Sequence, residues 1–160
     1  MSMMPFQVPS EMNIIVNEIG RGGFGVVNRV ELPDGRVVAL KTTLSRGDSH
    51  SLADDLNHLR SELAFMIKMG PHNNILKTEG SWGLACGFVT QYCPLGTLYD
   101  LLYSHDNFPP FMRYEGVKFK IIYDMTNGLS HVHQFGPHHD FKPDNVVILY
   151  EGKGFCLPYY

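Results

Sequence analysis

Three polar residues that could handle a proton and a metal lie within residues 138–145, which read HHDFKPDN. Asp140 could accept a proton from a hydroxyl group, and Asn145 could offer its amide oxygen to a metal ion held on phosphate groups. Lys142 lies between them. One short loop could therefore position a base and a metal ligand for phosphate chemistry. The alternatives are an ordinary polar surface turn, or a fortuitous metal site made by the clustered histidines His131, His133, His138 and His139.

A glycine cluster near the start of the chain could bind phosphate groups. Residues 20–25 read GRGGFG, so that Gly20, Gly22 and Gly25 form a G-x-G-x-x-G pattern. Such a cluster most often marks only a flexible turn. In a dinucleotide-binding fold the glycines lead from a strand into a helix, whereas residues 26–30 here, VVNRV, are strand-like. We therefore expect the tip of a β-hairpin, where bare backbone can fold over phosphates.

Lys41 ends the apolar segment VALK at residues 38–41. A lysine beside such a strand is usually a surface residue whose stem covers apolar neighbours. In this position it could instead pair with the α- and β-phosphates of a nucleotide, and its charge would then need an acidic partner when no nucleotide is bound. The best candidate for that partner is Glu62. The alternative for Glu62 is a solvated carboxylate on a helix surface.

The expected elements form an α+β chain. Three strands occupy residues 14–19, 26–30 and 37–40, and the turn Pro33-Asp34-Gly35 separates the last two. Leucines at helical spacing predict a helix over residues 52–67, ended by Gly70 and Pro71. Further predicted segments are strands at 75–77 and 87–90, a short helix at 98–103, a longer helix at 117–135 and a strand at 146–149.

Composition excludes several classes of protein. The chain has 160 residues, of which 44% are apolar and 18% charged, and its net charge is −3, which predicts a soluble globular domain without a nucleic-acid surface. Neither a secretory signal nor an apolar run long enough for a membrane span is visible. Three widely spaced cysteines match no disulfide or zinc pattern. A reducing, cytoplasmic location is therefore expected.

These motifs, taken in order, resemble the protein kinase superfamily over about residues 14–157. VALK resembles the kinase V-A-I-K motif, and Asp140 and Asn145 match the spacing of H-R-D-L-x-x-x-N. The resemblance implies a kinase fold: an antiparallel five-stranded small lobe with one packed helix, followed by the start of a helical large lobe. It implies a tail at 1–12 and a partial kinase domain at 13–160, with a small lobe at about 13–92, a hinge at about 90–97 and a large lobe from about 98.

The same resemblance implies a role for each matched residue. Asp140 would be the catalytic base, Lys142 would contact the γ-phosphate and Asn145 would bind Mg²⁺. Lysine at this position is similar to serine/threonine kinases rather than tyrosine kinases. The residues implied to bind ATP are Ile19, Gly20, Gly22, Gly25, Val27, Ala39, Lys41, Glu62, Thr90, Gln91 and Cys93. Among these, Thr90 would be the gatekeeper and the backbone of Gln91 and Cys93 would bond the adenine.

Two departures from the family pattern affect the expected activity. His139 stands where most members have arginine, and no aspartate follows Asn145 where the Asp-Phe-Gly motif is expected. Phosphoryl transfer depends on the metal that this aspartate holds. We therefore expect the partial domain of an ATP-dependent serine/threonine kinase that acts on a protein hydroxyl and is inactive alone. The alternative is a pseudokinase that binds nucleotide or a partner kinase.

Overall fold

The computed structural model describes residues 15–23, 25–44, 49–83, 86–103, 110–149 and 155–156. The chain forms two compact units. Unit 1 comprises Met1–Ile67 and Lys77–Tyr92, and unit 2 comprises Lys68–Leu76 and Cys93–Tyr160.

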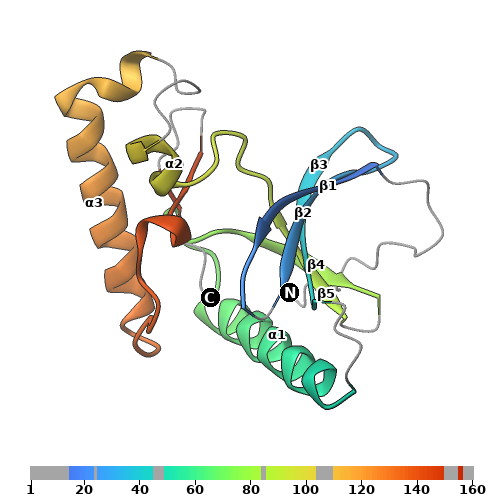
Figure 1. The fold of residues 1–160 in the computed structure, drawn as a ribbon. Helices are drawn as coiled ribbons and strands as arrows, with labels where there is room; N and C mark the ends of the chain where they lie inside the picture. Colours follow the sequence, from blue (N-terminus) through green and yellow to red (C-terminus); the bar gives the residue numbers. More distant parts are fainter. Residues whose placement is uncertain are drawn as a thin grey trace. The chain divides into compact units, whose positions relative to one another are not determined.

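Unit 1 is built on an antiparallel sheet of five strands in the order β1-β2-β3-β5-β4 (Figure 1). Helix α1 (Ser49–Met69) follows the third strand along the chain. The predicted five-stranded antiparallel sheet with one helix is therefore confirmed. The strands are β1 (Ile15–Arg21), β2 (Val26–Glu31), β3 (Val37–Thr42), β4 (Thr78–Trp82) and β5 (Gly87–Gln91).

The turn between β2 and β3 follows from its sequence. Gly35 has a φ of 82°, a conformation that glycine adopts without steric cost. The Gly35 N–H donates to the Leu32 carbonyl at 2.9 Å, and the Arg36 N–H donates to the Asp34 carboxylate at 3.0 Å. The predicted Pro-Asp-Gly turn is thus confirmed, and it fixes the register in which β2 pairs with β3.

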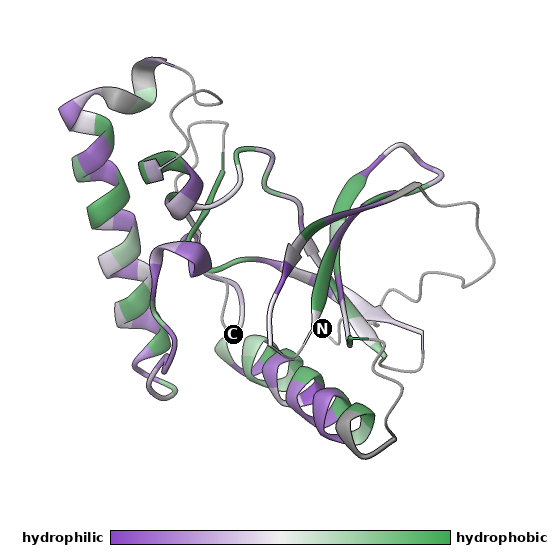
Figure 2. Ribbon diagram, viewed as in Figure 1, coloured by the Kyte–Doolittle hydropathy of each residue, from purple (hydrophilic) through white to green (hydrophobic). Residues whose placement is uncertain are grey.

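The apolar core of unit 1 lies on one face of the sheet. Alternate residues of a strand point to the same face, and directly paired residues share a face. Val30 pairs with Val38, and Leu40 pairs with Val89. Figure 2 shows the hydrophobic colouring along the central strands of the sheet. The buried cluster on this face consists of Val30, Leu32, Val38, Leu40 and Val89, with Trp82 packed against it.

One predicted strand is wrong. Residues 75–77 do not form a strand; Ile75 and Leu76 are buried, and β4 begins at Thr78. A short apolar run has the same appearance whether it pairs in a sheet or packs as a buried connection. The real strand has the polar sequence TEGSW and a register irregularity between Thr78 and Gly80, so it carries little strand signal.

Unit 2 contains helices α2 (Leu98–Tyr103) and α3 (Glu115–Val132) and a short strand pair, β6 (Val147–Ile148) with β7 (Phe155–Cys156). The prediction for α2 is confirmed. Helix α3 begins two residues before the predicted start at 117 and ends three before the predicted end at 135. Two short 3-10 helices complete the unit, η1 (Pro110–Arg113) and η2 (Pro143–Asn145).

The segment that follows the polar loop at 138–145 is hydrogen-bonded to the start of α2. The Leu98 N–H donates to the Val146 carbonyl at 2.7 Å, and the Ile148 N–H donates to the Gly96 carbonyl at 2.9 Å. Thr97 and Asp100 cap the same helix start, because the Asp100 carboxylate accepts from the Thr97 N–H at 2.9 Å. In the described part of the chain, no helix has the length and apolarity that crossing a membrane requires.

Candidate functional site

The sheet register gathers four predicted nucleotide-binding residues on one face of unit 1. Val27 pairs with Lys41 across β2 and β3, and Ala39 pairs with Thr90 across β3 and β5. Ala39 and Lys41 are alternate residues of one strand, so all four side chains share a face. This face is opposite to the one that carries the apolar core. Ala39 and Thr90 are buried there, and Val27 is half-buried.

The glycine-rich segment joins β1 to β2 as predicted for a hairpin tip. Gly20 pairs with Val27, and a register shift between Glu18 and Gly20 interrupts the ladder. The Gly22 N–H donates to the Gly25 carbonyl at 2.9 Å. Ile19, which is predicted to cover the adenine ring, has 48% of its surface exposed in this structure.

Gly25 is required for a close approach between strands. A Cβ atom added at Gly25 would lie 2.6 Å from the Thr42 carbonyl oxygen, whereas one added at Gly22 would meet nothing within 4 Å. We expect Gly25→Ala to lower the free energy of unfolding by about 1–3 kcal/mol, the usual cost of overpacking. Gly22→Ala is the matched control and should change it by less than about 1 kcal/mol. Denaturant unfolding of both variants checks this; equal losses would contradict it.

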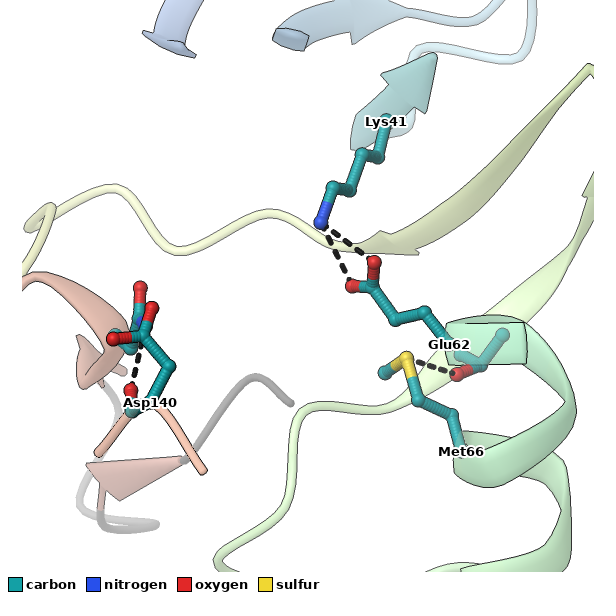
Figure 3. A network of polar contacts seen from close by, with 6 residues as sticks. Lys41, Glu62, Met66 and Asp140 are labelled. Carbon is teal, nitrogen blue, oxygen red and sulfur yellow. Dashed lines mark hydrogen bonds and ion pairs between the residues drawn. The ribbon is translucent and has the colours of Figure 1, made fainter. Parts of the chain in front are cut away.

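Lys41 and Glu62 form a largely buried ion pair. The Lys41 Nζ lies 2.7 and 2.9 Å from the two carboxylate oxygens of Glu62, and each side chain is only 12% exposed. Figure 3 shows the lysine on β3 directed at the glutamate on α1. Burial lowers the pKa of Lys41 and raises the pKa of Glu62, while the attraction between the two charges opposes both shifts. The ammonium group is thus held on the predicted nucleotide face.

A contact that the sequence analysis missed lies directly across the sheet from Lys41. Phe88 pairs with Lys41 in the register of β3 and β5, and the Lys41 Nζ lies 5.9 Å from the centre of its ring. Phe88 is 2% exposed and adds a weak cation–π attraction to the ion pair. The sequence gives no signal for this contact, because it depends on the register of two strands separated by a helix and another strand.

Gln91 and Cys93, the predicted adenine-binding residues, lie in different units. The Gln91 N–H donates to the Lys77 carbonyl at 3.0 Å within unit 1. The Cys93 carbonyl accepts from the Gly96 N–H at 3.2 Å within unit 2. Their role toward adenine stays a prediction.

Unit 2 brings together the three predicted catalytic residues. The Asn145 Nδ2 donates to both the carbonyl and the carboxylate of Asp140, at 2.8 and 2.9 Å. The Lys142 Nζ lies 2.9 Å from the same carboxylate, and both side chains of this ion pair are about half exposed. The hydrogen bond from Lys142 is the main cause that lowers the pKa of Asp140, and Asn145 adds to it. The Asp140 carboxylate is therefore held in its ionised form.

A tight backbone turn orients Asp140. The Asp140 N–H donates to the His138 carbonyl at 2.8 Å, and the residue between them, His139, has a φ of 62°. A three-residue turn of this hand is rare and strained. His138 is buried, and its ring meets Phe141 edge-on with 5.8 Å between the ring centres. The buried His138 ring thus fixes the position of the residue at which the turn begins.

The donor set in this loop is compatible with a magnesium ion. Mg²⁺ prefers oxygen ligands and often takes only one or two from the protein. Asn145 uses its Nδ2 atom for the two bonds to Asp140, which leaves Oδ1 as the end of the amide that neither bond engages. The Asn145 Oδ1 atom thus fits one ligand position of such a metal site. Among the described residues, no group of three or more His, Cys, Asp or Glu could enclose a metal by itself.

Comparisons with known proteins agree with these motifs. The protein kinase domain family matches residues 14–156. The chain is 33% identical over 142 residues to the receptor protein-tyrosine kinase CEPR1 of Arabidopsis thaliana, covering 82% of this chain and 14% of that protein. It is 29% identical over 139 residues to the probable serine/threonine-protein kinase roco5 of Dictyostelium discoideum, covering 84% of this chain and 5% of that protein.

A third relative is the calmodulin-binding receptor-like cytoplasmic kinase 3 of Arabidopsis thaliana, 30% identical over 138 residues, with 82% of this chain and 26% of that protein covered. The chain therefore spans about a quarter or less of the length of these three relatives. Because the family match extends over most of the 160 residues and includes both the glycine-rich segment and the catalytic loop, this chain belongs to the protein kinase domain family.

Proposed function

We propose that this chain is the nucleotide-binding and catalytic-loop part of an ATP-dependent serine/threonine protein kinase, which transfers the γ-phosphate of ATP to a hydroxyl group of a protein. The observation that carries the proposal is the set of bonds on Asp140. Lys142 and Asn145 both contact its carboxylate, and Asn145 also binds its backbone carbonyl. Such contacts keep a carboxylate ionised and fixed in direction, as a base for a substrate hydroxyl needs.

Unit 1 supplies the groups proposed to bind the nucleotide. Lys41 provides a positive charge for the α- and β-phosphates, and Glu62 holds that charge in place. The glycine-rich segment offers backbone without side chains close to the same strand, since Gly25 lies beside the backbone of Thr42. Val27, Ala39 and Thr90 share the face of Lys41 and would form the apolar surface for the adenine ring.

Unit 2 supplies the groups proposed to act on the substrate. Asp140 would accept the proton of the attacking hydroxyl, and Lys142 would compensate negative charge on the transferred phosphate. Asn145 would hold Mg²⁺ through its amide oxygen. When bound with ATP, this metal supplies neutralisation of the charge on the phosphates. Serine/threonine specificity is supported by Lys142 two positions after Asp140. Of the relatives, roco5 is named a probable serine/threonine-protein kinase and CEPR1 a receptor protein-tyrosine kinase.

A second candidate function is nucleotide or partner binding without phosphate transfer. It is favoured by the Lys41–Glu62 pair, which is complete within unit 1 and needs no residue of unit 2. Exposed apolar side chains on α3, Phe119, Ile122 and Tyr123, offer a surface for a protein such as a partner kinase. A cytoplasmic location remains a prediction.

Thermal unfolding with and without magnesium-ATP tests nucleotide binding. A ligand at 100 times its Kd stabilises the native state by about 2.7 kcal/mol, so we expect a clear rise in Tm. The control is the double variant Lys41→Met with Glu62→Leu, which removes the ammonium without leaving a buried charge. It should unfold cooperatively and show no shift. Absence of a shift in the unsubstituted chain, or an equal shift in the double variant, would contradict the proposed site.

A further inference from the structure

A pair of stacked histidines connects two segments of unit 2. The rings of His72 and His131 lie nearly parallel, with 4.4 Å between their centres and 14° between their planes. His72 lies in the turn that follows α1, and His131 lies in the last turn of α3. Beside them, the Asn127 Nδ2 donates to the Asn74 Oδ1 at 2.8 Å. These four residues, called here the histidine anchor, fasten the turn to α3.

The hydrogen bonds define where each neutral imidazole carries its proton. The His131 Nε2 lies 3.0 Å from the Met69 carbonyl oxygen. A carbonyl only accepts, so His131 must be protonated on Nε2. The His72 Nδ1 accepts from the Asn74 N–H at 3.1 Å, so His72 must be unprotonated on Nδ1 and carry its proton on Nε2.

The two histidines therefore respond differently to a second proton. His131 can take one on Nδ1 and keep its bond to Met69. His72 can take one only on Nδ1, which is the atom that accepts from Asn74, so its protonation removes that hydrogen bond. The proton also places a positive charge against the stacked ring of His131. Asn74 is only 4% exposed, so this hydrogen bond lies away from water and its loss lowers the stability of the folded chain.

The surroundings of His72 favour its neutral form. The ionisable side chain that faces it among the described residues of α3 is His131, which also contacts Phe135 with 5.2 Å between the ring centres. From the end of α1 the neighbouring groups are the Met69 carbonyl and the exposed Lys68. Burial lowers the pKa of His72 from its ordinary value of 6.5, and the charge of His131 lowers it further.

The pH dependence follows from the direction of this shift. Below pH 6.5 the unfolded chain binds a proton at His72 more readily than the folded chain does. The stability that the neutral form contributes is therefore complete above pH 6.5. It is lost as the pH falls from that value through the folded pKa.

We propose that the histidine anchor is a proton-sensitive attachment, in which protonation of His72 releases the turn at 72–74 from α3. The neutral anchor keeps the turn on the helix. The protonated anchor loses the hydrogen bond from the Asn74 N–H to His72 and carries a positive charge against the ring of His131.

The test compares the full chain with His72→Asn between pH 5 and 8. The Oδ1 atom of asparagine can accept the same bond from the N–H two residues later, as in an Asx-turn, but it does not titrate in this range. His133→Asn is the matched control, because His133 is exposed and lies two residues from His131. NMR follows the Asn74 amide and the Asn127 side-chain amide, and denaturant unfolding gives the stability at each pH.

In the unsubstituted chain and in His133→Asn, both amide resonances should shift with the titration of the His72 ring. The unfolding equilibrium constant should then rise by about two- to tenfold on acidification, which is what one ordinary hydrogen bond contributes. In His72→Asn this rise of about two- to tenfold in the unfolding equilibrium constant on acidification should be absent. Retention of the full pH dependence in His72→Asn would overturn the proposal, as would Asn74 and Asn127 resonances that do not follow the His72 titration.

Discussion

Lys41→Ala should lower the free energy of unfolding by about 3–5 kcal/mol, which is the cost of leaving one partner of a buried ion pair without the other. The reason lies in Glu62, whose carboxylate is held by two hydrogen bonds from Lys41 and whose side chain is 12% exposed. Without the ammonium group, the Glu62 carboxylate must either stay charged although it is largely buried, or take up a proton. Urea unfolding at pH 7 measures the loss.

A double variant separates the pair's stability from its function. Lys41→Met combined with Glu62→Leu removes both charges and fills similar volume, and such replacements are often neutral or stabilising by about 1–4 kcal/mol. We therefore expect the double variant to recover most of the stability lost in Lys41→Ala, while magnesium-ATP no longer raises its Tm. A double variant as unstable as Lys41→Ala would show that the ion pair is needed for folding itself.

Asp140→Asn should reduce the rate of phosphate transfer by about 10²–10⁴, the range that a general base contributes. The change removes the negative charge but keeps the shape of the side chain. Asp140 lies in unit 2 and the Lys41–Glu62 pair lies in unit 1, so the Tm shift caused by magnesium-ATP should remain. The assay follows label from the γ-phosphate of ATP into peptides with a single serine, threonine or tyrosine.

The control for this variant is Asp144→Asn, because Asp144 is exposed in the same loop and the charge change is identical. It should retain transfer. Equal rates in Asp140→Asn and the unsubstituted chain would exclude Asp140 as the base. No transfer by the unsubstituted chain, together with an intact Tm shift, would agree with the expectation that this chain binds nucleotide but is inactive alone. The sequence-based expectation that this chain is inactive alone is decided by the same assay.

The sequence predicted best those elements whose signal is local. The Pro33-Asp34-Gly35 turn depends on the backbone preferences of three adjacent residues, and α2 has the bounds expected from its sequence. The pairing of Lys41 with Glu62 was expected from the family motif. Strand β4 was misplaced because its polar residues pair only through tertiary structure, while the apolar residues before it are buried in a turn.

The side chains that pack around the predicted site residues were harder to predict than the site residues themselves. Phe88 comes next to Lys41 only through the β3–β5 register, and the stack of His72 on His131 joins residues that are far apart in sequence. The four histidines around residues 131–139 appeared in the sequence as a possible metal cluster. Among the described residues they form no such site; His131 packs against His72, and His138 packs under its own loop.

At His139 the backbone, and not the side chain, sets the direction of the next residue, Asp140. The direction of Asp140 depends on the positive φ and on the bond between the Asp140 N–H and the His138 carbonyl, neither of which involves the imidazole. The His139 side chain is exposed. A substitution at this position can thus alter the charge without turning the Asp140 carboxylate, provided that the new residue tolerates a left-handed backbone. Histidine is among the residues that do so more readily, and it can stand here in place of the family's arginine with the geometry of the next residue preserved.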